Sequence, residues 1–241
     1  MTEPTDPQRD EAAVWQGVKQ LLGSERIALG YHWSYNLRQD PKRLGFVLSR
    51  YKFAAKMACT GAHVLELGCS EGIGTPILAE FARSYTGIDM DAQAISEATA
   101  NWGSESLRFV HTDFMGRHFD CPPAGSQQGF GAIVSMDVVE HIYPEYDALF
   151  WETVHTNLDP GGIAVIGTPN ITSEPYASAA SRQGHVNLYG AERLKAAMDS
   201  ICHTSFLFGI NDEMVHTGYH AMCHFLVAVG CYRRERIEAA P

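Results

Sequence analysis

The chain has 241 residues, and its 18 lysines and arginines against 28 aspartates and glutamates give a formal net charge of −10. This acidic balance argues against a general nucleic-acid binder or a protein of anionic membrane surfaces, because such proteins neutralise phosphates with clustered basic residues. A hydrophobic fraction of 45% with 19% charged residues is ordinary for a globular protein and excludes a disordered chain.

The cysteines and the N-terminal residues indicate the cellular compartment in which the protein is expected. The six cysteines form no C-x-x-C pair, and several stand in apolar runs, which is typical of free buried thiols in a reducing compartment. The N-terminal residues are polar and acidic, and no apolar run approaches the roughly 20 residues that span a bilayer. We therefore expect a cytoplasmic protein with no secretion signal and no membrane span. The oligomeric state stays open, a homodimer included.

The first 60 residues predict a helical cap. Residues 11–22 and 41–57 carry apolar side chains at helical spacing, and Pro41 suits the first turn of the second helix. The aromatic stretch 31–35 between them is not periodic, so a loop or a cap is expected there.

From residue 61 onward, short apolar runs alternate with helical segments. Strands are predicted at 63–67, 85–89, 107–111, 130–136, 163–168, 204–210 and 220–231. Helices are predicted at 73–83, 91–101, 144–158 and 191–201, and a long polar loop at 169–189. Strands that alternate with helices predict a parallel sheet. The last two strands have no room for a crossover helix, so they predict an antiparallel hairpin.

A glycine-rich loop follows the first of these strands, at Gly68, Gly72 and Gly74. Glycines at a strand-to-helix turn let the backbone approach a ligand closely, and the helix start offers unpaired N–H groups. The spacing fits neither the G-x-G-x-x-G dinucleotide fingerprint nor a P-loop. Glu66, just before the loop, would repel a phosphate, so a cationic or hydroxyl-bearing ligand is favoured.

Here the sequence resembles the class I S-adenosylmethionine-dependent methyltransferases, whose first motif reads (D/E)-x-G-x-G-x-G. Ser70 stands where the middle glycine of that motif usually lies. Asp89 ends the second strand, where the family's acidic residue binds both ribose hydroxyls, and Asp159-Pro160-Gly161-Gly162 resembles the family's turn before the fifth strand. The resemblance implies S-adenosyl-L-methionine as cofactor, bound by Glu66, Gly68, Cys69, Ser70, Gly72, Asp89, Met90, Asp113, Phe114 and Met136.

The same resemblance implies the fold. We expect an α/β protein with a Rossmann-like, doubly wound sheet of seven strands in the order 3-2-1-4-5-7-6, the last strand antiparallel. Residues 1–60 would form the N-terminal helical cap, and residues 61–241 the methyltransferase domain.

A segment with Asp137, Glu140 and His141 follows the fourth strand, at the sheet edge that faces ligands. On a helix these side chains would share one face. They predict a metal site for Mg²⁺ or a similar cation, or an acid–base pair of Glu140 and His141. The segment resembles the E-x-x-E-H of the ubiquinone-biosynthesis O-methyltransferases, in which those residues are assigned to magnesium. Alternatively, the glutamate caps a helix and the histidine packs near the cofactor.

His185 lies in the long loop after the fifth strand, within a Gly-His-Val-Asn-Leu-Tyr run similar to one in that group. Methyl transfer to a hydroxyl needs a base, and histidine is the natural one at neutral pH; fixing the loop is the alternative role. We therefore expect transfer to a hydroxyl of a small polar metabolite, such as a sugar or a nucleotide-linked sugar. Transfer to a small amine or an amino sugar, and a non-catalytic cofactor-binding regulatory protein, remain alternatives.

Overall fold

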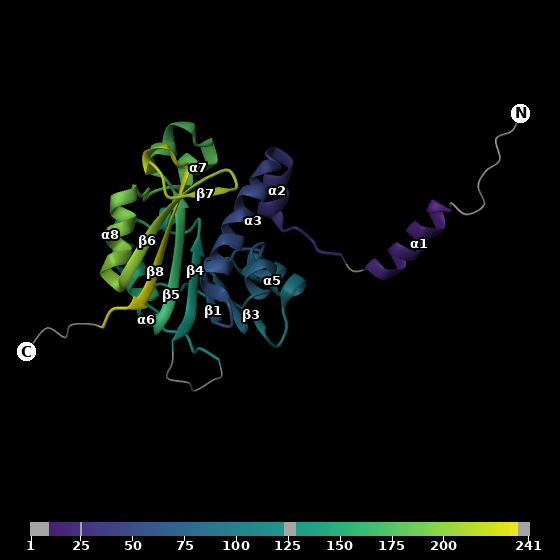
Figure 1. The fold of residues 1–241 in the computed structure, drawn as a ribbon, viewed down its shortest axis with the longest axis horizontal. Coiled ribbons are helices and arrows are strands. Elements are labelled where there is room, and N and C mark those ends of the chain that lie inside the picture. The colour runs from purple at the N-terminus through teal and green to yellow at the C-terminus, as the bar shows by residue number, and fades with distance from the viewer. Residues whose placement is uncertain (1–9, 25, 123–128, 236–241) are drawn as a thin grey trace, which may run out of the picture.

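The computed structural model describes residues 10–24, 26–122 and 129–235. The outer ends of the predicted segments 1–60 and 61–241 thus lie outside the described residues. Figure 1 shows a central sheet with helices on both faces, which is the doubly wound α/β architecture that the sequence predicts.

Over the described residues, the sheet has eight strands in the order β3-β2-β1-β4-β5-β8-β6-β7. They are β1 His63–Leu67, β2 Ser84–Asp89, β3 Leu107–His111, β4 Phe130–Met136, β5 Leu158–Pro169, β6 Cys202–Asn211, β7 Met214–His216 and β8 Phe225–Arg233. The first five strands are parallel, and β8 runs antiparallel between β5 and β6. The seven predicted strands keep their predicted order, with β8 as the predicted seventh strand, and the antiparallel last strand is confirmed. The observed order differs only by β7 at the edge.

The strand count of seven was wrong by one. The extra strand β7 has three residues and pairs with the outer edge of β6, from which it folds back through a two-residue turn. Asp212 adopts a φ of 52° in that turn, a left-handed conformation that aspartate tolerates better than most residues. A strand this short carries no alternation that a sequence pattern could reveal.

The α-helices are α1 Glu11–Leu22, α2 Tyr31–Gln39, α3 Lys42–Ala54, α4 Thr75–Ala79, α5 Ala92–Trp102, α6 Asp147–Asn157, α7 Ala179–Gly184 and α8 Ala191–Ile201. A π-helical turn, Ala55–Cys59, extends α3. Short 3₁₀ turns lie at Val139–His141, Pro144–Tyr146, Ile171–Tyr176 and His220–Met222.

Two apolar cores lie on the two faces of the sheet, because successive strand residues point to opposite sides. Leu65 and Leu67 pack with residues of α6 and α8 in one core. Val64 packs with residues of α2, α3 and α4 in the other. The cap helices α2 and α3 thus share a core with the sheet that they cover.

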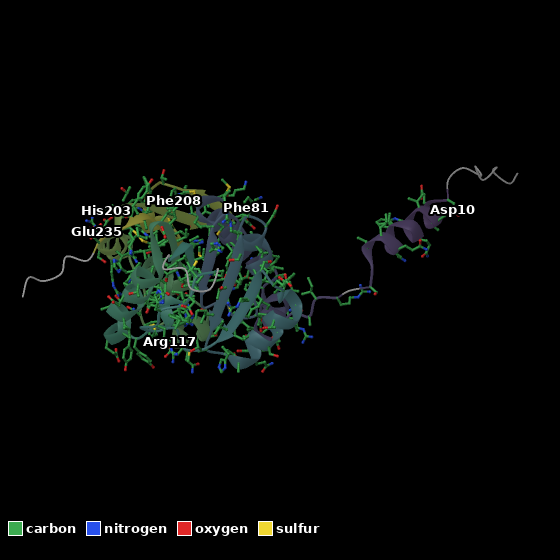
Figure 2. The ribbon with its side chains drawn as sticks, turned by 90° about the horizontal axis from the view of Figure 1, so that it is seen from below. Asp10, Phe81, Arg117, His203, Phe208 and Glu235 are labelled. Atoms are coloured by element: carbon green, nitrogen blue, oxygen red, sulfur yellow. The ribbon has the colours of Figure 1, made fainter. Side chains whose placement is uncertain are left out.

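The first helix stands apart from this body. None of the residues of α1 is buried, and Figure 1 shows the helix lying away from the sheet. In the view of Figure 2, Asp10 at the start of α1 is well separated from the body that carries Phe208 and Arg117. Within the described residues, no helix is long and apolar enough to cross a membrane.

The expectation of a loop or cap at 31–35 was wrong, because α2 begins there. Its N-cap is Gly30, which has no side chain to accept from the first free N–H groups. Glu71 takes that role from the glycine loop: its carboxylate accepts from His32 N at 2.7 Å and from Trp33 N at 3.0 Å. A cap supplied from nearly 40 residues away leaves no local signal in the sequence.

The long polar loop predicted at 169–189 also contains more structure than expected. It folds into the 3₁₀ turn Ile171–Tyr176 and the short helix α7. Asn170 and Ser178 begin these turns by accepting from Thr172 N and Ser181 N. Local caps therefore organise a segment that has no apolar periodicity.

Candidate active site

The glycine loop turns sharply between β1 and α4. Gly68 has a φ of 80°, and a Cβ there would lie 2.3 Å from Val138 Cγ2, so only glycine fits. Ser70, in place of the family's middle glycine, also takes a positive φ of 48°. The serine thus adopts the left-handed conformation that this position of the loop requires.

Asp89, at the end of β2, joins that strand to the glycine loop. One carboxylate oxygen accepts from Ser70 N at 2.8 Å, and the other accepts from Asp91 N at 2.9 Å. The structure therefore brings together two residues predicted to bind the cofactor, and it places the Asp89 carboxylate against the backbone of the glycine loop at Ser70.

Glu66 lies beneath the loop and is completely buried. Its carboxylate accepts from the hydroxyl of Tyr51 on α3 at 2.7 Å and from the hydroxyl of Tyr85 on β2. Burial raises the pKa of Glu66 to about 7, and the two tyrosine hydrogen bonds oppose this rise. One oxygen thus links α3 to the sheet and the other links β1 to β2. A cofactor contact through Glu66 stays a prediction.

This buried carboxyl predicts a pH effect on stability. Because its pKa is raised from 4.5 to about 7, folding keeps Glu66 protonated where the unfolded chain ionises it. Its contribution to the free energy of unfolding is fully present below pH 4.5 and is lost as the pH rises to about 7. This loss amounts to about 3 kcal/mol. Glu66→Gln should therefore match the wild type in unfolding free energy at pH 4.5 and exceed it at pH 8, measured by urea denaturation.

The matched control for this measurement is Glu105→Gln, because Glu105 is exposed in the loop before β3. This variant should follow the wild type at both pH values. A Glu66→Gln variant that loses as much stability between pH 4.5 and 8 as the wild type would contradict the assignment.

The residues predicted around the adenine are split between surface and core. Met90 is exposed, and its carbonyl lies 3.1 Å from Nε2 of His111. Phe114 is buried with its ring against Phe150. Asp113 is exposed, and one of its carboxylate oxygens accepts from Met115 N at 2.9 Å.

Two hollows meet at the carboxyl end of β4. The smaller, about 80 Å³, lies over the glycine loop, and its walls include Cys69, Ser70 and Met136. The larger, about 370 Å³, lies toward the segment 173–188 and includes His185. Arg43 and Asp137 line both.

Glu140, His141 and His185 form a cluster on the side of the larger hollow. One nitrogen or oxygen from each lies within 4.8 Å of the others. Glu140 is fully buried, and one oxygen accepts from the Thr168 hydroxyl at 2.9 Å. Its Oε1 has no hydrogen-bond partner among the residues that the structure describes. Nδ1 of His141 lies 2.9 Å from the Gly184 carbonyl, so that nitrogen donates and Nε2 is left as an acceptor or ligand.

The backbone holds this cluster together. The carbonyl oxygen of Glu140 accepts from Val186 N at 2.9 Å and from Asn187 N at 3.0 Å, which fixes the chain next to His185. Burial, followed by the charge of Asp137, raises the pKa of Glu140 to about 8. Burial, followed by the charge of His141, lowers the pKa of His185. These shifts favour the protonated form of Glu140 and the neutral form of His185, which can accept a proton.

The set predicted for a metal, Asp137, Glu140 and His141, is not the set that the structure brings together. The segment is a 3₁₀ turn rather than an α-helix, and Asp137 precedes it with a φ of 56°. Its carboxylate pairs with the Arg50 guanidinium, whose Nη1 donates at 3.0 and 3.2 Å. His185 therefore joins Glu140 and His141 in place of Asp137.

Two contributors to the site were not predicted from the sequence. Glu71 was missed because its partner is backbone far away in the chain. Arg43 was missed although it carried a usable signal: it stands seven residues before Arg50 in the predicted helix 41–57, and this spacing places both on one helical face.

The two hollows lie at the carboxyl ends of the parallel strands of an α/β sheet, which is where sheets of this kind bind ligands. Residues 38–201 match a family model described as a methyltransferase domain. The chain belongs to the methyltransferase domain family.

Two curated relatives show the range of similarity. A Mycolicibacterium smegmatis protein named "Probable S-adenosylmethionine-dependent methyltransferase" is 30% identical over 140 residues, which are 58% of this chain and 49% of the relative. A ubiquinone biosynthesis O-methyltransferase of Psychrobacter arcticus is 24% identical over 172 residues, 70% of this chain and 61% of the relative. The chain thus spans about half to three-fifths of the length of these relatives.

Solved structures support the fold. N-methyltransferase NodS from Bradyrhizobium japonicum WM9, in complex with S-adenosyl-L-homocysteine, superimposes with a TM-score of 0.56 at 19% identity. The match covers 84% of this chain and 92% of that chain. At this identity the likeness concerns the fold alone.

Proposed function

We propose that the protein transfers a methyl group from S-adenosyl-L-methionine to a hydroxyl of a small polar metabolite, such as a sugar or a nucleotide-linked sugar. The observation that carries this proposal is the pair of hollows that share Asp137 and Arg43. One hollow lies on the glycine loop, where the family motif stands, and the other faces His185. A cofactor on the loop would thus have its reactive end beside an acceptor in the larger hollow.

Asp89 would bind the ribose hydroxyls, and Met90, exposed just after β2, would cover the adenine. Gly68 and Ser70 would allow the cofactor to approach the backbone of the loop. The small hollow lined by Cys69 and Met136 would take the methionine end. The bound cofactor supplies an electrophilic methyl group on a sulfonium.

His185 would act as the general base. The acceptor oxygen attacks the methyl carbon while the carbon–sulfur bond breaks, and the hydroxyl proton passes to His185. A lowered pKa keeps His185 neutral and ready to accept this proton at pH 7. Much of the rate would come from holding the acceptor oxygen in line with the methyl group, an effect worth roughly 7–11 kcal/mol in well-oriented reactions.

The direct test is titration of the purified protein with S-adenosyl-L-methionine by calorimetry, followed by assays of S-adenosyl-L-homocysteine formation with small alcohols, sugars and amines. Saturable binding with turnover of a hydroxyl compound supports the proposal. Turnover of amines alone would favour N-methylation, and binding without turnover would favour a regulatory protein. The absence of saturable binding would overturn all three.

A divalent metal is a second candidate role for Glu140, His141 and His185. Within the described part of the chain, the buried Oε1 of Glu140 has no hydrogen-bond partner, and a cation could satisfy such an atom. Two imidazoles and one carboxylate suit Zn²⁺, Fe²⁺ or Mn²⁺ better than Mg²⁺, which prefers oxygen ligands. These three residues would hold the ion, which would supply Lewis-acid activation of the acceptor hydroxyl.

Removal of metal separates the two roles. With His185 as base, dialysis against EDTA should leave turnover unchanged, and equilibrium dialysis should detect no tight site for Zn²⁺ or Mn²⁺. A metal role predicts loss of turnover, its return with one of these ions, and one bound ion per chain that is absent from Glu140→Gln. His203→Gln, an exposed histidine on β6, is the control for non-specific binding.

A further inference from the structure

Asp147, the first residue of helix α6, is bound to the stretch of chain that follows His185. Its Oδ1 accepts from Nδ2 of Asn187 at 2.9 Å and from the hydroxyl of Tyr189, which stand 40 and 42 residues further along the chain. Its Oδ2 pairs with Nη2 of Arg193 at 3.2 Å. One carboxylate therefore joins the start of α6 to the segment that carries the proposed base.

The two donors to Oδ1 are buried. Asn187 is 3% exposed, and Tyr189 is completely buried. The Tyr189 hydroxyl also accepts from Nε1 of Trp151 at 2.9 Å. Burial, followed by the hydrogen bond to Asp147, raises the pKa of Tyr189, so its hydroxyl keeps the proton that it donates. Removing the carboxylate would leave two buried donors without this acceptor, which costs more free energy than the loss of a solvated hydrogen bond.

Asn187 is anchored at two points. Its backbone N–H donates to the Glu140 carbonyl at 3.0 Å, and its side chain donates to Asp147. It stands two residues after His185, which lines the larger hollow. Asp147 is not among the described residues that line either hollow. Asp147 can thus act on the proposed acceptor site only through its neighbours, and the loop that carries His185 is its direct link.

We propose that Asp147 is a positioning residue for the general base: it holds the loop so that the His185 imidazole faces the acceptor. Displacement of a reacting group by about 1 Å can cost a large part of the rate, because the reaction depends on orientation. The buried donors Asn187 and Tyr189 would transmit the constraint. The Arg193 side chain is 43% accessible, so solvent screens its ion pair and this contact contributes little.

The role of His185 as base rests on the proposed function, but the anchoring of its loop does not, and amide hydrogen exchange measures it without any substrate. Val186 N and Asn187 N both donate to the Glu140 carbonyl, so their exchange rates report how firmly the loop is held. Asp147→Ala should speed exchange at both amides about tenfold or more, because two buried donors lose their acceptor. Asp147→Asn keeps an acceptor oxygen and should stay within about threefold of the wild type.

A control amide separates a local effect from general destabilisation. Val134 is completely buried in the central strand β4, so its amide exchanges only when the sheet opens. It should exchange at the wild-type rate in Asp147→Ala. A matched control variant is Asp199→Ala, which breaks the ion pair with Lys195 on α8. This variant should leave exchange in the loop after His185 unchanged.

Kinetics then test whether the anchoring acts through the base. The substrate is the hydroxyl compound that the wild type converts fastest in the assay of S-adenosyl-L-homocysteine formation. Asp147→Ala should lower kcat about tenfold or more and leave the affinity for S-adenosyl-L-methionine unchanged, and Asp147→Asn should restore most of the rate. In the His185→Gln background, Asp147→Ala should lower kcat no further, because the group that it positions is already absent.

Three results would overturn the proposal. The first is wild-type exchange at Val186 and Asn187 in Asp147→Ala, and the second is faster exchange at Val134 to the same extent. The third is a fall in kcat that is equally large with and without His185, because the carboxylate would then act on another group. If the wild type binds no S-adenosyl-L-methionine, the proposed function fails, and the exchange rates alone decide whether Asp147 anchors the loop.

Discussion

Replacing Asp89 with alanine should weaken S-adenosyl-L-methionine binding by about a hundredfold. The carboxylate accepts from Ser70 N and Asp91 N, so its loss both frees the glycine loop and removes the proposed ribose acceptor. Hydrogen bonds to a charged group contribute about 1.5–3 kcal/mol each, and a tenfold change in affinity corresponds to about 1.4 kcal/mol. Calorimetric titration of the wild type and of Asp89→Ala measures the difference.

Asp89→Asn distinguishes the two contributions, because an amide oxygen still accepts from one backbone N–H but carries no charge. It should bind the cofactor with intermediate affinity. Asp113→Ala, which removes the acceptor of Met115 N, should have a smaller effect than Asp89→Ala. Unchanged affinity in a folded Asp89→Ala protein would remove this residue from the site.

The second large effect is expected at His185. His185→Ala should lower kcat by about 10²- to 10⁴-fold, the usual contribution of a general base, while the affinity for S-adenosyl-L-methionine stays the same. The pKa of His185 is lowered below 6.5 by burial and by His141, so the base loses its function only when it is protonated at still lower pH. The pH profile of kcat should therefore be flat near neutrality and fall on an acidic limb with a midpoint below 6.5.

His185→Gln keeps a polar side chain in the loop but cannot accept a proton in this way. If the histidine only fixes the loop, this variant should retain most of the activity and the same pH profile. If His185 is the base, it should be as inactive as His185→Ala. His203→Gln serves as the control variant in the same assays.

The sheet was predictable because its signals are local. The strand runs are short and apolar, and the glycine loop and Asp89 stand at strand ends that a parallel sheet brings to one edge. The two missed features escaped for different reasons. Glu71 caps α2 from nearly 40 residues away in the chain, and β7 has only three residues, too few to show an alternating pattern.

The site was predictable in part for the same reason. Glu140 and His141 are adjacent in sequence and stay together, but His185 reaches them only because backbone bonds from Val186 and Asn187 fix its loop. Asp137 is not part of this cluster, because the backbone takes a positive φ there and does not continue the helical spacing on which the predicted set depended. Its partner Arg50 comes from α3, 87 residues earlier in the chain, and no spacing rule links the two.

The capping of α2 by Glu71 links the N-terminal helical segment to the glycine loop of the sheet. Glu71 is itself buried, and the N–H groups of His32 and Trp33 are what compensate its carboxylate for the loss of water. A chain that lacked residues 1–60 would leave the Glu71 carboxylate without its two N–H donors, and Glu66 without the hydroxyl of Tyr51. Ordering of the helical cap and ordering of the glycine loop are therefore linked. The ordered cap stabilises the ordered loop by the same free energy by which the ordered loop stabilises the cap.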